Sequence, residues 1–214
     1  MLNQQIEFVR AFFDHQPTEK IAENCLGRKL IYDGPHGTVA AYIVEAEAYL
    51  GQNDSTAHAY HGRRTASNEP LYGEPGTVYI YSIHGRYLFD VVTQPKDVPQ
   101  GILIRAGQPC DGIAIMEQNR NKHGVNLTNG PGKLMEAFGI HDMKMNQQYV
   151  NDCPIRMDLN HRLMPERVVA SSRIGVNQSG PSANSPLRFY VAGNPYVSGM
   201  LKRDRLKNNG WKNN

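Results

Sequence analysis

One strand-like run constrains the fold of this chain more than any other segment. Residues 37–49 have the sequence GTVAAYIVEAEAY, which alternates with period two. If the run stays extended throughout, one face carries six side chains, namely Val39, Ala41, Ile43, Glu45, Glu47 and Tyr49. That face changes from apolar to acidic. The run therefore predicts a strand with two carboxylates at one end of an otherwise apolar face.

Other segments predict the remainder of a mainly antiparallel sheet with short helices. Residues 77–83 and 87–93 are joined at His84-Gly85 as in a hairpin. Apolar spacings of three and four predict a packing helix over residues 2–14. Further strands are expected at 102–106, 168–176 and 187–191, and further helices at 111–119 and 132–138. This mixture indicates an α+β fold.

A short helix is also expected directly after Pro17. It starts with Thr18 as its N-cap, runs through Cys25 and Leu26, and has Gly27 as its terminator in the left-handed conformation. No linker divides the chain convincingly, and 214 residues with 40% hydrophobic content suit one globular domain, residues 1–214. Residues 202–214 form a polar, partly basic tail with the composition of a disordered segment.

Charge and cysteine content exclude several classes of protein. The net charge of +3 is small for a protein held on nucleic acid by charge alone. Three scattered cysteines without a CxxC pair predict neither a disulfide framework nor a cysteine-rich zinc site. The chain has no signal-peptide pattern at its start and no membrane-spanning apolar run. We therefore expect a soluble, cytoplasmic protein.

Glu45 and Glu47 are the first candidate chemical groups. Their carboxylates share a face two residues apart, so in a dry cleft one of them needs a cation or a hydrogen-bonded partner. A solvated strand edge is the common alternative for such a pair. The polar loop at 51–76 favours a functional site over a solvated edge for this pair, because a loop of this length in a compact domain is more often functional than idle. Arg105, after three apolar residues, either caps the sheet or pairs with a carboxylate.

Aromatic and glycine-rich segments add further candidates. Tyr49, Tyr79, Tyr81 and Tyr87, with His58 and His84, either pack against the core or sandwich a planar ligand. His58 and His61 lack a third ligand, so no metal is expected. Residues 130–133, GPGK, either start a helix or present N–H groups and Lys133 to an anion. A DNA phosphate suits this segment better than a nucleoside triphosphate does.

Six segments, in this order, resemble the alkyladenine (3-methyladenine) DNA glycosylase family. They lie at residues 44–68, 76–87, 101–109, 130–134, 171–176 and 186–198, and the resemblance runs from about residue 26 to 197. It implies a curved, mainly antiparallel sheet surrounded by short helices, as in formyltransferase C-terminal domains. It also implies a monomeric enzyme of base excision repair that flips an alkylated or deaminated purine out of duplex DNA, hydrolyses its N-glycosidic bond, and uses no metal or cofactor.

The resemblance also implies roles for individual residues. Glu47 matches the general base that activates water, and Arg105 and the carbonyl of Ile174 match the groups that hold that water. Glu45 matches a supporting acidic position. The base pocket maps to Tyr49, His58 and Tyr81. The two tyrosine rings stack on the purine, and the histidine forms a hydrogen bond with its edge. No lysine falls among the pocket positions, so Schiff-base lyase chemistry is not expected.

Two positions depart from the family pattern, and both concern specificity. His84 stands where a tyrosine wedge fills the hole left in the duplex. The asparagine that excludes guanine maps to Asp90 if one residue is deleted after Tyr87, or to Val91 without a gap. Asp90 is preferred because residues 91–93 then continue the strand. A carboxylate there accepts a hydrogen bond from the guanine amine where the asparagine repels it, which weakens discrimination against guanine.

The remaining expectations concern DNA contact. The expected contact residues, besides His84 and Tyr87, are basic, namely Arg63, Arg64, Arg86, Lys133 and Arg188. If these basic residues lie on one DNA-facing side and the two glutamates lie in the pocket, the glutamates lower the net charge without weakening phosphate contact. The net charge then understates how well this surface binds DNA. Two alternatives remain open. One is a binding module that recognises damaged or single-stranded nucleic acid without cutting it, and the other is a hydrolase of free modified nucleosides.

Overall fold

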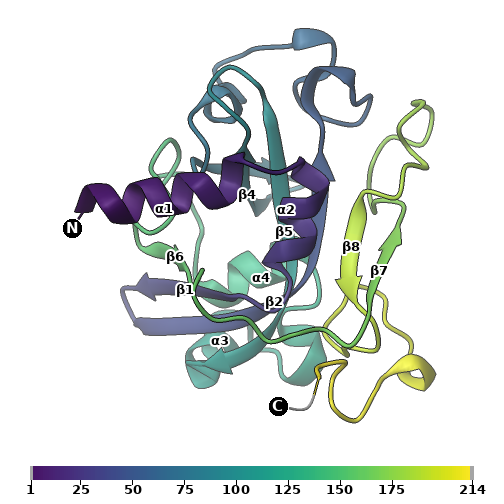
Figure 1. Cartoon of the computed structure of the whole chain (residues 1–214). Coiled ribbons are helices and arrows are strands. Elements are labelled where there is room, and N and C mark those ends of the chain that lie inside the picture. Colours follow the sequence, from purple (N-terminus) through teal and green to yellow (C-terminus); the bar gives the residue numbers. More distant parts are fainter. Residues whose placement is uncertain (1, 213–214) are drawn as a thin grey trace.

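The computed structural model describes residues 2–212, which form a curved sheet with helices packed against it (Figure 1). The strand order is β3-β4-β5-β2-β1-β6, and β8 pairs with both β2 and β7. Every pairing among these strands is antiparallel. The strands are β1 (Lys29–Gly34), β2 (Gly37–Tyr49), β3 (Val78–Ile83), β4 (Arg86–Thr93), β5 (Gln100–Asp111), β6 (Ile155–Met157), β7 (Val168–Ser171) and β8 (Arg188–Val191).

Four α-helices contact the sheet in two pairs. α1 (Leu2–Asp14) and α2 (Thr18–Cys25) contact each other, as do α3 (Ile113–Arg120) and α4 (Pro131–Phe138) (Figure 1). Short 3₁₀ turns lie in the connections, at Gly51–Asn53, Tyr60–Gly62, Glu69–Tyr72, Gly124–Leu127 and Lys202–Asp204. The α+β class and the mainly antiparallel sheet predicted from the sequence are confirmed.

Several predicted elements have different bounds in the structure. β5 extends well beyond 102–106, whereas β7 ends at Ser171 rather than at residue 176. The chain leaves the sheet there because the next buried side chain, Arg173, points to Asp54 instead of a strand neighbour. β1 and β6 were not predicted. Their alternation is weak, and they are defined by pairing, β1 with both β2 and β6.

The C-terminal segment is packed against the domain, in contrast to its composition. Trp211 is 8% exposed, and its Nε1 donates a hydrogen bond to the side chain of Gln108 at 2.9 Å. Trp211 also forms a β-bridge with Pro165. The expectation of a disordered tail is therefore wrong for residues 202–212, because one buried indole fixes an otherwise polar segment.

Thr18 does not cap α2, in contrast to the prediction. Pro17 occupies the N-cap position, and Thr18 is the first helical residue. The Thr18 hydroxyl is buried, donates to Gln100 Oε1 at 2.6 Å and lies 2.8 Å from Thr93 Oγ1. Gly27 has φ +82°, as predicted for the terminator. Thr18 thus links α2 to the ends of β4 and β5.

We expect Thr18→Val to lower the free energy of unfolding by about 1–3 kcal/mol, because it leaves buried partners of the hydroxyl unpaired. Urea denaturation measures this change. Thr18→Ser keeps the hydroxyl and is the matched control. Equal losses in both variants would assign the effect to the lost methyl group instead.

A change of register in β2 determines which side chains face the core. Residues 39, 41 and 43 belong to the hydrophobic core before the irregularity, whereas residues 44, 46 and 48 belong to it afterwards. The register against β5 shifts between Ile43 and Glu45 and again between Glu45 and Ala46. The predicted single face from Val39 to Tyr49 is therefore wrong. The bulge keeps the apolar side chains in the core and places both glutamates on the opposite face.

Candidate active site

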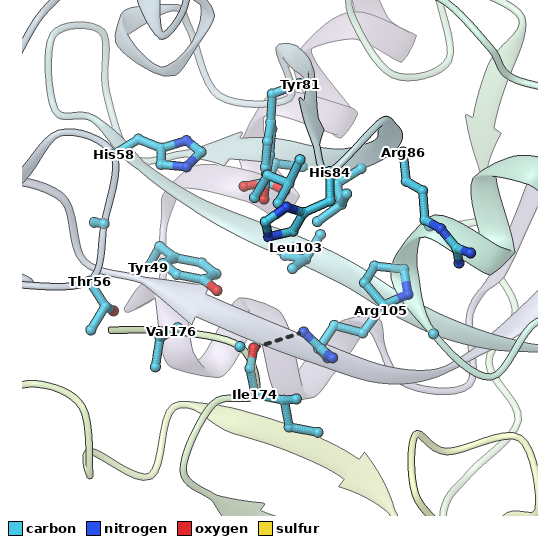
Figure 2. A pocket seen from close by; sticks show the side chains of 18 of the residues that line it. Tyr49, Thr56, His58, Tyr81, His84, Arg86, Leu103, Arg105, Ile174 and Val176 are labelled. Atoms are coloured by element: carbon cyan, nitrogen blue, oxygen red, sulfur yellow. Dashed lines mark hydrogen bonds between the residues drawn. The ribbon is translucent and has the colours of Figure 1, made fainter. Parts of the chain in front are cut away.

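A cavity of about 600 Å³ opens over the face of the sheet that carries the two glutamates. Its walls come from β2 to β5, from the loops at 56–58 and 174–177, and from the start of α4. Of the residues predicted from the sequence, nine line this cavity, namely Tyr49, His58, Tyr81, His84, Asp90, Arg105, Lys133, Ile174 and Arg86. Figure 2 shows most of these side chains around the central space.

The strand register aligns the acidic groups on the cavity side. Asp90 lies opposite Tyr79 on β3 and opposite Leu103 on β5, and Leu103 lies opposite Glu47 on β2. Residues directly opposite each other in a sheet share a face. Asp90 and Glu47 therefore face the same side, with Leu103 between them, while Val91 lies in the hydrophobic core. Of the two positions considered for the guanine-excluding residue, only Asp90 faces the cavity.

Glu47 lies just beneath the cavity and is fully buried. Its Oε2 accepts hydrogen bonds from Arg105 Nη1 at 3.1 Å and from the Tyr49 hydroxyl at 2.9 Å. Its Oε1 accepts the backbone N–H of Ile174 at 2.8 Å. Arg105 Nη1 also reaches the Ile174 carbonyl at 3.4 Å (Figure 2). Glu47, Arg105 and Ile174 are thus brought together by segments far apart in the sequence.

Glu45 is held by a different set of donors. Its Oε1 accepts Arg105 Nε at 3.0 Å and Arg188 Nε at 2.6 Å, and its Oε2 accepts the Ser198 N–H at 2.8 Å. Arg188 is only 8% exposed. The expectation that Arg188 faces DNA is therefore wrong, because the buried Glu45 carboxylate requires a cation beside it.

The two glutamates have different proton affinities. Burial raises the pKa of Glu45, but the guanidinium groups of Arg105 and Arg188 outweigh it and hold the pKa below its ordinary value. Burial also raises the pKa of Glu47, and here the single guanidinium of Arg105 and the hydrogen bonds do not compensate for it. Glu45 is thus a fixed anion, whereas Glu47 is the more basic carboxylate, as a proton acceptor requires.

Aromatic rings form the upper wall of the cavity. His58 and Tyr81 meet edge to face, with ring centroids 4.7 Å apart, and Tyr81 stacks on Tyr79 at 4.8 Å. His58 Nδ1 lies 2.9 Å from the Tyr79 hydroxyl. Figure 2 shows Tyr49 on the other side of the space from Tyr81, with His58 at its edge. Two flat rings separated by a gap suit a planar ligand, as expected for Tyr49 and Tyr81.

The rim of the cavity carries the hairpin tip and a helix start. His84 and Gly85 both have positive φ, 51° and 73°, as a two-residue hairpin turn requires. His84 is exposed and points over the cavity (Figure 2). Residues 130–133 form another part of the rim, where α4 begins at Pro131. Lys133 Nζ donates to Asn129 Oδ1 at 2.8 Å.

Besides the buried Arg188, three expected DNA contacts lie outside this cavity. Arg63 is exposed and lines a second groove, of about 660 Å³, on the far side of His58 and Tyr81. Arg64 is bound by Glu69 at 2.6 Å and by Asp97 at 2.8 Å. Tyr87 packs against the hydrophobic core. Their contact with DNA remains a prediction, and Arg64 has protein partners that DNA would have to displace.

Sequence reasoning gave no role to Arg173, which orders two of the cavity walls. Its guanidinium forms hydrogen bonds with both carboxylate oxygens of Asp54, at 2.5 and 2.8 Å, and with the Ala48 carbonyl at 2.8 Å. It also lies 4.6 Å from the centre of the Tyr49 ring. Arg173 directly precedes Ile174 and lies in the matched segment at 171–176. Its place beside Ile174 in this segment is the one sequence feature that could have pointed to Arg173.

Two kinds of feature are absent from residues 2–212. No group of three or more histidine, cysteine, aspartate or glutamate side chains there is arranged to hold a metal ion. No helix in this part of the chain has the length and apolar character needed to cross a membrane.

Comparison with known proteins gives a consistent set of similarities. The model of the methylpurine-DNA glycosylase (MPG) family matches residues 11–195. Relatives provisionally named as 3-methyladenine DNA glycosylases include proteins of Latilactobacillus sakei and Lactobacillus helveticus, each 51% identical over 94% of this chain. These alignments cover 95% and 97% of the relatives. A similarly named protein of Staphylococcus haemolyticus is 44% identical over 94% of this chain and 99% of its own.

Proposed function

The chain belongs to the methylpurine-DNA glycosylase family, and from this premise we propose that it releases alkylated or deaminated purines from duplex DNA. The base flips into the cavity, water cleaves its N-glycosidic bond, and an abasic site remains. The substrates proposed are 3-methyladenine, 7-methylguanine and hypoxanthine. Such an enzyme acts in base excision repair and works where chromosomal DNA is found.

One arrangement carries this proposal. Arg105 Nη1 donates both to Glu47 and to the Ile174 carbonyl, at the floor of a cavity walled by aromatic rings. A water molecule at this floor has an acceptor in Glu47, an acceptor in the carbonyl and a donor in Arg105. Glu47 takes one proton from the water as the oxygen attacks the sugar carbon. Tyr49 and Tyr81 stack on the two faces of the base and hold it above this water.

The direct test is the release of free base from a defined duplex. A duplex oligonucleotide with one 7-methylguanine is incubated with the enzyme, and the free base and abasic strand are both measured. We expect both products in equal amounts. Salt-sensitive binding of the damaged duplex with no release would favour the binding module. Turnover of free 7-methylguanosine but not of the duplex would favour the nucleoside hydrolase.

Strand cleavage distinguishes hydrolysis from lyase chemistry. We propose that the enzyme is monofunctional, because the one lysine that lines the cavity, among the described residues, is Lys133 on the rim. The abasic strand should remain intact until alkali is added. Borohydride should trap no covalent complex between enzyme and DNA.

We propose that His84 is the wedge that replaces the flipped base in the duplex. His84→Ala should lower the single-turnover rate on duplex DNA about tenfold, equivalent to 1.4 kcal/mol of barrier, because the stacked helix is left with a hole. His84→Tyr should restore it. Excision from a single strand, which has no hole to fill, should change little. An equal loss on both substrates would instead place His84 in the base pocket.

A further inference from the structure

Asp90 is a buried carboxyl group with no part in the activation of water by Glu47 and Arg105. It is 4% exposed, lines the cavity, and shares a sheet face with Glu47. Among the described residues, its Oδ1 is buried without any hydrogen-bond partner. A buried oxygen left unpaired in this way costs stability, which proteins usually tolerate only at functional sites. The unpaired oxygen therefore indicates a partner that arrives with the ligand.

The groups facing Asp90 offer it no compensating cation. Three tyrosines, Tyr49, Tyr79 and Tyr81, lie near enough for a charge on Asp90 to raise their own pKa values. Of the two arginines lining the cavity in the described chain, Arg105 is bound by both glutamates and Arg86 faces Glu136. Lys133, on the rim, donates to Asn129. His58 and His84 lie at the mouth and the rim.

These surroundings favour the neutral acid. Burial raises the pKa of Asp90 well above its ordinary value, and the charge of Glu47 raises it further, while a hydrogen bond with Tyr81 acts in the opposite direction. The pKa values of both carboxyl groups are raised, but Asp90 lacks the guanidinium partner that Glu47 has in Arg105, so Asp90 is the one of the two that retains its proton more readily. The cavity thus contains one proton donor and one proton acceptor, separated by Leu103.

The chemistry of the proposed reaction needs such a donor for one class of base. A purine alkylated on a ring nitrogen is already a cation, so it leaves the sugar as a neutral molecule. A neutral purine such as hypoxanthine leaves as an anion unless it gains a proton as the bond breaks. Glycosidases solve the same problem with one carboxylic acid and one carboxylate on either side of the bond.

Resting on the function proposed above, we propose that Asp90 is a second catalytic residue, the general acid that protonates a neutral purine as it leaves. The Asp90 proton passes to a ring nitrogen of the base while the electron pair of the broken C–N bond moves onto that base. Water adds to the sugar carbon and loses a proton to Glu47. Solvent then returns a proton to Asp90 and removes one from Glu47, so the net reaction is hydrolysis.

His58 is the competing donor, and its geometry is less suitable. One ring nitrogen lies 2.9 Å from the Tyr79 hydroxyl. His58 is an exposed residue, yet desolvation of its ring lowers its pKa below the ordinary value and the charge of Arg63 lowers it further. A neutral imidazole still forms a hydrogen bond with the edge of the base. It is a poorer source of a proton at neutral pH than a protonated carboxyl group.

The test compares a neutral and a cationic base in one duplex sequence. Single-turnover release of hypoxanthine and of 3-methyladenine, a cationic base without the 2-amino group of guanine, is measured for the wild type and for Asp90→Asn, which keeps the shape of the side chain. We expect the variant to release hypoxanthine about 10²-fold more slowly, the scale of general acid catalysis. Its release of 3-methyladenine should fall much less, because a cationic base needs no added proton. Urea denaturation checks that the variant is folded. Asp152→Asn, an exposed carboxyl, is the matched control.

The pH profile gives a second readout that a structural role would not change. A general acid acts only below its pKa, so wild-type hypoxanthine release should fall as pH rises through the pKa of Asp90. It should also fall at low pH, where Glu47 becomes protonated. In Asp90→Asn, the rate of hypoxanthine release should no longer fall at high pH but should still fall at low pH. The ratio of variant to wild type at each pH removes any titration of the DNA itself.

Three results would overturn the proposal. They are equal losses on both bases, an alkaline fall that survives in Asp90→Asn, and a wild type that releases 3-methyladenine but not hypoxanthine. The failure of the proposed function itself looks different, because the wild type then releases neither base.

Discussion

Glu47→Gln is expected to reduce the release of both 7-methylguanine and hypoxanthine by about 10³-fold, within the range of general-base catalysis. The amide keeps the shape of the side chain but cannot take a proton from water. Every base, cationic or neutral, requires an activated water, so the loss should not depend on the charge of the base. Single-turnover release from a defined duplex, with enzyme in excess, measures this step without product dissociation.

The binding of damaged DNA separates lost chemistry from lost structure. Glu47 forms hydrogen bonds with Arg105, Tyr49 and the Ile174 N–H, so the glutamine also turns an N–H₂ group toward one of these donors. We expect the affinity for the damaged duplex to change by less than about threefold, because none of the phosphate contacts is altered. Glu7→Gln, on the exposed side of α1, is the matched control. Full activity in Glu47→Gln would remove Glu47 from the reaction.

Glu47 shows how far a sequence can identify a site. Alternation placed Glu45 and Glu47 on one face, and the resemblance assigned the two residues different roles. The structure adds the physical cause of that difference, since Glu45 has two guanidinium partners and Glu47 shares one. The bulge in β2 was not predictable, because a one-residue change of register leaves the pattern on each side intact.

Arg188 shows why a basic residue is easily misplaced. Most arginines are exposed, and nothing near Arg188 in the sequence indicates a carboxylate partner. That partner, Glu45, is 143 residues away in the chain and meets Arg188 because β8 pairs with the end of β2. Trp211 was misjudged for the same reason, since its contact with Gln108 is visible only once the fold is assembled.

Arg173→Met should lower the free energy of unfolding by about 3–5 kcal/mol, the usual cost of breaking a buried ion pair on one side. The Arg173 and Asp54 side chains are 0% and 1% exposed, so the remaining carboxylate of Asp54 would have neither water nor a cation beside it. Methionine keeps much of the length and apolar surface of the arginine stem. Urea denaturation followed by fluorescence measures the change.

The double variant Asp54→Asn with Arg173→Met tests this cause. Asparagine carries no charge and keeps one oxygen, which can accept the Thr56 N–H as Oδ1 does, while its N–H₂ group replaces the oxygen that accepts the Leu50 N–H. If the unpaired charge causes the loss, the double variant should be more stable than Arg173→Met alone by about 1–3 kcal/mol. A double variant as unstable as the single one would instead assign the loss to the contacts of Arg173 with Ala48 and Tyr49.

The ion pair of Arg173 and Asp54 should affect the reaction only by positioning the side chains of the active site. Arg173 touches no reacting atom, yet it fixes the segment that places the Ile174 N–H on Glu47 and lies against the Tyr49 ring. In the double variant at low temperature, where the protein stays folded, base release should slow at saturating enzyme while its dependence on pH stays the same. If the fall in rate at low pH moves to a different pH, Arg173 also sets the proton affinity of Glu47. The segment would then act electrostatically rather than by positioning Glu47.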